Sequence, residues 1–317
     1  MIPPPLVSVV VSTYDRPERL ARLLDALRAQ TLGPERFEVI VIDNGSRPGT
    51  GRVLAGQVAQ GGLELRTCRL PLTRGPAGGR NAGWRLAAAA LVAFTDDDCR
   101  PAPDWLQAAL VVAGRHPGAI VQGVTRPDPD ERDRGGPFSH TVRIECLGPQ
   151  YETCNILYPR ALLVALDGFD ESFGLRPAGE DTDLAWRAIE SGVLTVQAPA
   201  AVVWHAVERI GPVGMLRLAA RWGPAVRVLA KHPQTRTMLY RGRFWNVWHY
   251  LLWRSVLAAV GPAWLRRQLL TRHLMTLRAR AVQEGGGTAA IPFLLLHDAV
   301  ECWAIARGAI RHRTLVL

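Results

Sequence analysis

LVSVVVST at residues 6–13 and EVIVID at residues 38–43 are the two apolar runs that decide the fold. Both are rich in β-branched residues, which is the pattern of a strand buried on both faces. Between them, residues 18–30 carry leucines at helical spacing. This order predicts a βαβ unit, in which the strands are parallel and the ligand crevice lies at their carboxyl ends.

Three consecutive acids, Asp96, Asp97 and Asp98, follow a further apolar run at residues 87–94. Like charges repel, so these carboxylates are costly at the end of a buried strand unless a positive group accompanies them. Mg²⁺ and Mn²⁺ bind carboxylate oxygens and leave positions for phosphate oxygens. The triplet therefore predicts a site for a metal and a diphosphate. The alternative is an acidic loop that caps the helix expected after Asp104.

Polar side chains also follow the first two strands, namely Thr13, Asp15 and Asp43. The carboxyl ends of parallel strands meet at one edge of a sheet, so we expect these residues to lie beside the triplet. The carboxylates of Asp15 and Asp43 suit the N–H groups of a nucleobase and the hydroxyls of a ribose. No Gly-x-Gly-x-x-Gly follows the first strand, which argues against a dinucleotide-binding domain.

A glycine-rich run at residues 75–79 is flanked by Arg74 and Arg80. Glycine permits close approach of a backbone to a ligand, and a helix starting near Asn81 would direct its backbone amides at an anion. Arg74, Arg80 and Asn81 are therefore candidate contacts for a phosphorylated ligand. The alternative is an ordinary flexible loop.

A second acidic segment, with Glu180, Asp181 and Asp183, opens a helix whose apolar face begins at Leu184. Acids in a first helical turn stabilise the helix dipole by ~0.3–1 kcal/mol, which is a purely structural explanation. The functional explanation is general-base catalysis, because a hydroxyl that attacks a carbon centre needs a carboxylate to take its proton.

Taken in order, these motifs resemble a family 2 glycosyltransferase of the GT-A fold, over residues 6–206. The triplet matches the DxD motif of that family, and the other matching segments are residues 9–16, 41–46, 78–83 and 179–184. The resemblance implies an α/β protein with a mostly parallel nucleotide-binding sheet flanked by helices. It also implies an inverting transferase that uses a nucleotide-diphosphate sugar and a divalent metal, Mn²⁺ or Mg²⁺.

The resemblance assigns the metal to Asp96 and Asp98, with Asp97 reaching the ribose or sugar. His205 ends an apolar run at residues 201–204 and stands where relatives often supply a metal or diphosphate ligand. Imidazole is an acceptable ligand for Mn²⁺ and a poorer one for Mg²⁺. The alternative for His205 is a structural histidine.

The resemblance places Asn155 at the donor sugar and the catalytic base on the pair Glu180 and Asp181. We favour Asp181 as the base, with Glu180 in acceptor binding or support. The chain departs from the family pattern at Asp167, where many relatives have glycine, and we expect this departure to affect only a turn.

Two other functions compete with this interpretation. A sugar-phosphate nucleotidyltransferase would have a glycine-rich loop with a lysine after the first strand, but residues 12–16 contain neither feature and Lys231 is the only lysine in the chain. A non-catalytic sugar-binding or scaffold protein would be free to lose mutually repelling acids. The complete acidic motifs argue against that alternative.

The C-terminal third differs from the rest in charge and composition. Residues 211–317 contain 16 basic and 3 acidic residues, and they hold six of the ten tryptophans. We therefore expect a catalytic domain over residues 1–210 and a basic, tryptophan-rich helical region over 211–317. Apolar spacing and helix-breaking residues predict its helices near 212–231, 244–259, 262–282 and 291–310.

Arginine and tryptophan beside short amphipathic helices indicate a surface that meets anionic lipid. The alternative is a helical subdomain that packs its tryptophans on the catalytic core and leaves its arginines in solvent. No nucleic-acid-binding motif accompanies the charge, so we expect no nucleic-acid partner.

The cysteines and the beginning of the sequence indicate the cellular compartment in which we expect the protein. Five scattered cysteines without a C-x-x-C pair predict reduced thiols. The first strand begins too close to Met1 to leave room for a signal peptide. The longest apolar pieces, residues 244–253 and 255–265, are too short to span a bilayer. We therefore expect a cytoplasmic protein, peripheral on the inner face of the cell membrane if the C-terminal region binds lipid.

Overall fold

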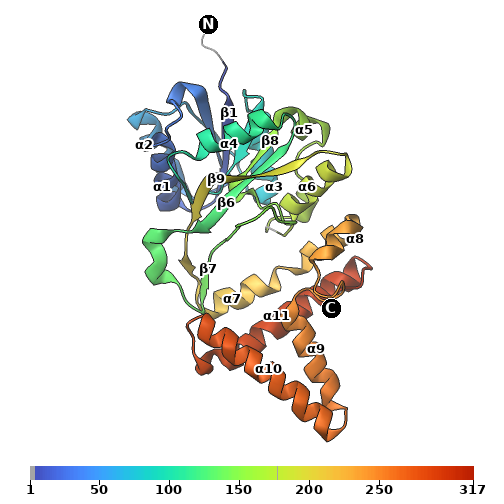
Figure 1. Ribbon diagram of the computed structural model, residues 1–317. Helices are drawn as coiled ribbons and strands as arrows, with labels where there is room; N and C mark the ends of the chain where they lie inside the picture. The colour runs from blue at the N-terminus through green and yellow to red at the C-terminus, as the bar shows by residue number, and fades with distance from the viewer. Residues whose placement is uncertain (1–3, 177) are drawn as a thin grey trace. The chain divides into compact units, whose positions relative to one another are not determined.

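The computed structural model describes residues 4–176 and 178–317, which divide into two compact units (Figure 1). The sheet unit comprises Met1–Glu131 and Thr141–Ala206, and the helical unit comprises Arg132–His140 and Val207–Leu317. Residues 132–140 join the helical unit because β7 (Ser139–His140) pairs antiparallel with β10 (Glu208–Arg209). This pairing adds a short upstream segment to the C-terminal region that the sequence predicted to begin at residue 211.

The sheet unit contains an eight-stranded sheet of order β3-β2-β1-β4-β8-β6-β9-β5. Its strands are β1 (Val7–Thr13), β2 (Phe37–Asp43), β3 (Leu65–Arg69), β4 (Leu91–Phe94), β5 (Cys99–Pro101), β6 (Ile120–Pro127), β8 (Ile156–Pro159) and β9 (Thr195–His205). β1 pairs in parallel with both β2 and β4, which confirms the predicted βαβ unit. β8 runs antiparallel to β4, so the sheet is mixed beyond its parallel half.

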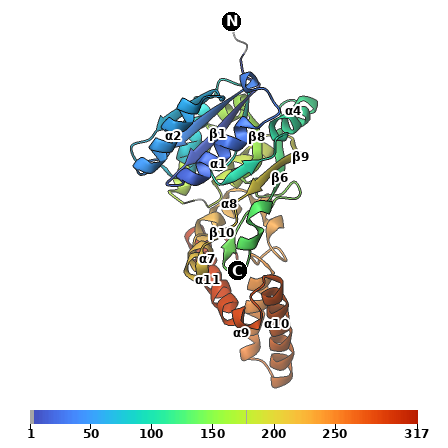
Figure 2. The same ribbon diagram turned by 90° about the vertical axis from the view of Figure 1, so that its left-hand side faces the viewer.

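Helices cover both faces of this sheet and bury its apolar strands (Figures 1 and 2). They are α1 (Pro17–Arg28), α2 (Pro48–Gln60), α3 (Gly75–Arg85), α4 (Trp105–Arg115), α5 (Arg160–Ala165) and α6 (Glu180–Glu190). One apolar layer includes Leu20 and Leu24 of α1 with Trp105 of α4. The other includes Trp84 of α3 and Leu184 of α6. The predicted leucine stripe after the first strand is therefore the buried face of α1.

The glycine-rich run is helical from Gly75 onward, so the prediction of a loop with a helix starting near Asn81 is wrong. Its glycines are explained by packing against β1. A Cβ atom on Gly79 would lie 2.0 Å from the Ser12 hydroxyl oxygen, and one on Gly83 would lie 2.4 Å from Val10 Cγ1. Small residues on this face let α3 lie directly on the strand that carries Thr13.

The helical unit has two small apolar clusters of its own. Its helices are α7 (Gly211–Ala220), α8 (Val226–Lys231), α9 (Val247–Ala259), α10 (Ala263–Gln283) and α11 (Ile291–Arg311). The first predicted helix is divided at η5 (Gly223–Ala225), and the other three lie within three residues of their predicted ends. One cluster is built around Val226 and Ile305, and the other around Leu277 and Leu294.

One helical segment, Thr288–Arg311, is long and apolar enough to cross a membrane by length and composition alone. The prediction that every apolar segment is too short is therefore wrong for this helix. However, α11 buries Asp298 and Glu301. Asp298 pairs with Arg280 of α10 at 2.9 Å, and Glu301 accepts a hydrogen bond from Asn246 at 2.9 Å. These partners are typical of a helix that packs among other helices rather than facing hydrocarbon.

Candidate active site

The ends of three strands gather around the acidic triplet, which lies between β4 and β5 and caps no helix. At the end of β1, the Thr13 hydroxyl donates a hydrogen bond to Asp97 Oδ2 at 2.7 Å. At the end of β9, His205 pairs in register with Cys99, which places its Nε2 atom 3.5 Å from Asp98 Oδ1. The triplet thus faces polar groups from strands that are distant in sequence. This agrees with the expectation that residues at the strand ends lie beside it.

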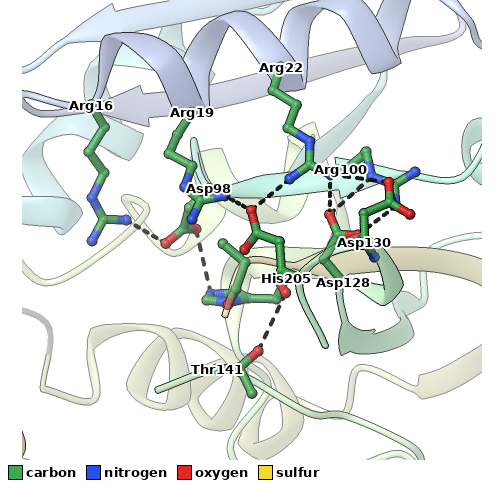
Figure 3. Close-up of polar contacts among 11 residues, drawn as sticks. Arg16, Arg19, Arg22, Asp98, Arg100, Asp128, Asp130, Thr141 and His205 are labelled. Carbon is green, nitrogen blue, oxygen red and sulfur yellow. Dashed lines mark hydrogen bonds and ion pairs between the residues drawn. The ribbon is translucent and has the colours of Figure 1, made fainter. Parts of the chain in front are cut away.

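The guanidinium of Arg16 is a positive partner of the triplet in this structure (Figure 3). Arg16 lies just before α1, where its Nη1 atom pairs with Asp98 and lies 3.4 Å from Asp97 Oδ1. Burial acts to raise the pKa of Asp98, but the neighbouring His205 and Arg16 outweigh it and leave that pKa lowered. Burial and the nearby Asp98 charge raise the pKa of Asp97 to about 7. Asp98 is therefore the more firmly ionised of these two carboxyl groups.

Asp98 and His205 are suited to hold a divalent cation. Their ligand atoms and the Cys99 sulfur all lie within 4.8 Å of one another. His205 Nδ1 lies 2.9 Å from the carbonyl oxygen of Ala206, which can only accept. This contact orients the imidazole ring and places Nε2 on the side of Asp98.

The chemistry of this group fits Mn²⁺, which accepts both carboxylate and imidazole ligands. Burial raises the pKa of Cys99 well above its usual value, so its thiol stays neutral and is a poor ligand for a hard cation. Asp96, predicted as a second ligand, is not part of this group. Its side chain is 32% exposed and pairs with Arg80.

Arg80 connects the triplet to the second acidic segment. One of its terminal nitrogens lies 2.9 Å from Asp96 Oδ1, and the other lies 3.0 Å from Glu180 Oε1. The guanidinium is buried, which acts to lower its pKa, but Asp96 and Glu180 raise that pKa above its usual value. Arg80 is therefore a permanent charge shared between two carboxylates that come from different parts of the fold.

Asp181 lies in the first turn of α6, beside Glu180. Its Oδ1 atom accepts a hydrogen bond from the Thr182 backbone N–H at 2.9 Å. Burial, followed by the charge of Glu180, raises the pKa of Asp181 to about 8, although Arg80 acts in the opposite direction. A third acid, Glu152, contributes to this rise and has its own pKa raised by burial. A carboxyl group with such a pKa can exchange a proton near neutral pH.

Glu152 was missed from the sequence. It lies three residues before Asn155, in the segment assigned to the donor sugar, and nothing local marks it as a neighbour of Asp181.

The predicted nucleoside contacts, Asp15 and Asp43, lie at adjacent strand ends. Asp15 accepts hydrogen bonds from the backbone N–H of Arg47 at 2.7 Å and from its side chain at 3.0 Å. The backbone bond is the main reason that the pKa of Asp15 is lowered. Asp43 Oδ1 accepts from the Ser46 backbone N–H at 2.8 Å.

The second oxygen of Asp43 is a buried acceptor with an unused lone pair. Among the described residues, Oδ2 has no hydrogen-bond partner, and Arg69 Nε lies 3.7 Å away. Buried polar atoms usually have a hydrogen-bond partner, so an exception at a strand end suggests a ligand group. A nucleobase N–H is a hydrogen-bond donor of the kind that this acceptor atom needs.

Two predicted donor contacts are engaged by the protein itself. The amide of Asn81 donates to the Phe169 carbonyl and to Glu171, and its oxygen accepts from Trp84 and the Phe169 N–H. Asn155 is fully buried and bonds to Trp105, Val124 and Ala201. The prediction that these amides contact the donor is therefore not supported by their geometry, because their hydrogen-bonding groups hold loops and strands together.

Arg74, the third predicted contact of the glycine-rich segment, is half-exposed at the start of α3 and pairs with Glu171 at 2.7 Å. Its side chain is a cation near the surface rather than part of the buried Arg80 bridge.

The ion pairs that two arginines of α1 form with acids after β6 were also not predicted from the sequence (Figure 3). Arg19 pairs with Glu131, and Arg22 pairs with Asp128 at 2.9 Å and with Glu131 at 2.8 Å. Asp128 and Glu131 are buried, so their carboxylates belong to the folded sheet unit rather than to its solvent-exposed surface. The signal was present as arginines three residues apart, which share one face of a helix.

We expect Arg16→Gln to tighten Mn²⁺ binding in the absence of nucleotide. The guanidinium and a cation compete for Asp98, so removing the guanidinium frees that carboxylate. An ion pair of ~1 kcal/mol corresponds to a gain of about fivefold in affinity. Calorimetric titration with Mn²⁺ measures it, with Arg22→Gln as the control because Arg22 pairs with other acids. Weaker binding in Arg16→Gln would show that Arg16 does not compete with the metal.

A mixed sheet with an acidic triplet after β4 and an acid-opened helix α6 defines the GT-A class of glycosyltransferase folds. The structure resembles the mannosyltransferase PcManGT from Pyrobaculum calidifontis, solved with GDP-Man and Mn²⁺, with a TM-score of 0.60. That comparison covers 98% of this chain and 88% of the other at 20% sequence identity. TarS 1–349 of S. aureus, solved with UDP, gives a TM-score of 0.54 at 18% identity, over 97% and 92% of the two chains.

Residues 8–164, most of which lie in the sheet unit, match the model of glycosyl transferase family 2. A validoxylamine A glucosyltransferase from Streptomyces hygroscopicus subsp. limoneus is 30% identical, over 80% of this chain and 61% of that protein. A pre-mycofactocin glycosyltransferase from Mycobacterium tuberculosis is 25% identical, over 87% of this chain and 58% of that protein. The chain thus spans less than two-thirds of the length of these relatives.

Proposed function

We propose that this chain transfers a sugar from a nucleotide-diphosphate sugar to an acceptor hydroxyl, with inversion at the anomeric carbon and with the help of a divalent metal. The observation that carries the proposal is the Arg80 bridge, at 2.9 Å to Asp96 and 3.0 Å to Glu180. It links the acidic triplet, through Asp96, to Glu180, which precedes Asp181 in the chain, and the raised pKa of Asp181 suits a base.

On the donor side, Asp43 accepts from the nucleobase, while Thr13 and Asp15 order the adjoining strand end. Asp98 and His205 hold the metal, Mn²⁺ or Mg²⁺, with Asp96 beside them on Arg80 and Asp97 directed at the ribose or sugar. When bound, the metal neutralises negative charge on the departing diphosphate. Arg74, at the start of α3, is a further cation available to the phosphates.

On the acceptor side, Asp181 takes the proton of the attacking hydroxyl. A bond forms between that oxygen and the anomeric carbon as the bond from the same carbon to the diphosphate oxygen breaks. Glu180 acts to raise the pKa of Asp181 and Arg80 acts to lower it, so these two residues set its charge environment. Attack from the face opposite the leaving group inverts the centre, so no nucleophile from the protein is required.

The comparisons support a nucleotide sugar as the donor. PcManGT was solved with GDP-Man, and TarS with UDP and with UDP-GlcNAc. The relatives with matching sequences bear the names of glycosyltransferases, which favours transfer over the nucleotidyltransferase and scaffold alternatives.

A thermal-shift screen of nucleoside diphosphates, with and without Mn²⁺, tests the donor site. A ligand present at 100 times its dissociation constant stabilises the native state by about 2.7 kcal/mol. We expect one nucleotide to raise the melting temperature in the presence of Mn²⁺ and to have a much smaller effect without it. No response to any nucleotide in the presence of Mn²⁺ would contradict the proposal.

The products formed from a panel of nucleotide sugars separate the three functions. A transferase releases nucleoside diphosphate in a metal-dependent way. A nucleotidyltransferase instead releases pyrophosphate from a nucleoside triphosphate and a sugar phosphate. A scaffold protein releases neither.

A further inference from the structure

We propose that the turn between α9 and α10 inserts its apolar side chains into an anionic lipid bilayer and so holds the protein peripherally on a membrane surface. The proposal rests on the helical unit alone and goes beyond the transfer reaction. It identifies which element of the C-terminal region contacts the membrane. The positive charge of that region does not identify this element by itself.

The first observation is an exposed apolar face that runs along α9 to its C-cap residue, Val260. Trp253, Val256, Leu257 and Val260 are 38%, 55%, 65% and 88% exposed. Their spacing of three, four and seven residues places them on one side of the helix. Trp264, 69% exposed, follows at the start of α10. A contiguous apolar face of this kind marks an interaction site on a folded protein.

The second observation is that α10 has a buried side and, separately, exposed apolar residues. His273 and Leu277 are buried on one side, and Ser255 of α9 lies 2.7 Å from the His273 ring nitrogen, so this side pairs the two helices. Leu274 and Met275 are 54% and 68% exposed. These exposed residues are therefore additional to the contact between α9 and α10.

The third observation is the position of the turn within the helical unit. Neither apolar cluster of the unit includes Trp253, Val260 or Trp264. Figures 1 and 2 both show the α9–α10 turn at an end of this unit that no other helix of the unit covers. Its apolar side chains are thus not part of the core that stabilises the unit.

Charge identifies the kind of partner. Residues 209–283 contain 14 lysine and arginine residues and no aspartate or glutamate. Among them, Arg266 and Arg267 are exposed in the first turns of α10, close in sequence to Trp264, and Arg272 and Arg278 are exposed further along the same helix. Basic side chains next to an exposed apolar face match anionic headgroups above a hydrocarbon layer.

Two other partners fit these observations less well. A second copy of the turn would bring two positively charged surfaces together, which is repulsive. Nucleic acid would neutralise the arginines but would leave the aliphatic face of Val256, Leu257 and Val260 in water. Only an anionic bilayer satisfies both the charge and the apolar face.

Co-sedimentation of the full chain with vesicles tests the proposal. We expect binding at low salt to be at least tenfold tighter to phosphatidylglycerol-containing vesicles than to phosphatidylcholine vesicles. Salt should weaken this binding without abolishing it, because screening removes only the electrostatic part. The double variant Val260→Glu/Trp264→Glu should bind the anionic vesicles at least tenfold more weakly. Val164→Glu is the matched control, since Val164 is 57% exposed on α5 of the sheet unit.

Both substituted residues of the double variant are exposed, so its circular dichroism and melting temperature should match those of the parent chain. Vesicle binding by the double variant equal to that of the parent would overturn the proposal, as would a parent chain that ignores anionic vesicles at low salt. A change in oligomeric state without a change in vesicle binding would assign the turn to a second copy instead. Binding to an oligonucleotide but not to vesicles would assign the charge to nucleic acid.

Discussion

Asp98→Asn is expected to abolish metal-dependent sugar transfer while leaving the fold intact. The substitution keeps the shape of the side chain but removes the charge that His205 and Arg16 face, and a neutral amide is a far weaker ligand for a hard cation. Calorimetric titration should show that Mn²⁺ binding is lost, and a nucleotide-release assay should show that transfer is lost with it.

Asp128→Asn is the matched control for this variant. Asp128 is also buried and paired with arginine, at 2.6 Å from Arg100, but it does not contact the triplet. We expect Asp128→Asn to affect stability more than Mn²⁺ binding. If Asp98→Asn retained activity with the same Mn²⁺ dependence as the parent, the triplet would have no part in the mechanism.

Asp181→Asn should lower turnover by ~10²–10⁴-fold, the usual range for loss of a general base. Donor affinity should barely change, because the residue acts on the acceptor. The pH profile gives a second measurement. The base must be deprotonated, and the pKa of Asp181 is raised to about 8, so turnover of the parent should rise with pH until it levels above that value. This rise should disappear in the variant.

Asp183→Asn, two residues further along α6, provides the control because its carboxylate pairs with Arg187 at 2.9 Å. It should keep the pH dependence of the parent. A variant of Asp181 with collapsed donor binding and intact turnover would make Asp181 a donor contact, and Glu180 would then be the next candidate for the base.

The predictable parts of this fold are those that depend on the pattern of apolar residues within single segments. The runs at β1 and β2 are apolar enough to be strands in any buried setting, and parallel pairing then brings Thr13 and Asp43 to one edge. The same logic placed the triplet at the end of β4. These conclusions needed only side-chain periodicity and the geometry of a parallel sheet.

The parts that were not predictable depend on partners distant in sequence. A glycine-rich run fits either a loop or a helix until the strand beneath Gly79 and Gly83 is known. Asn155 follows a motif-like pattern, yet its amide is held by carbonyls 31 and 46 residues away. Arg16 gave no local sign that it would pair with an acid 82 residues further along the chain.

The shared position of Arg80 has a consequence for the order of events. One guanidinium is shared between Asp96 and Glu180, so a weaker interaction with one carboxylate leaves a stronger interaction with the other. Any ligand that draws Asp96 away leaves more of this charge to Glu180, which weakens the repulsion from Glu180 that, after burial, raises the pKa of Asp181. Occupancy at the donor end would thereby release the base at the acceptor end, and by thermodynamic reciprocity an ionised Asp181 would favour that occupancy. Such an enzyme would activate its base only when the donor site is occupied.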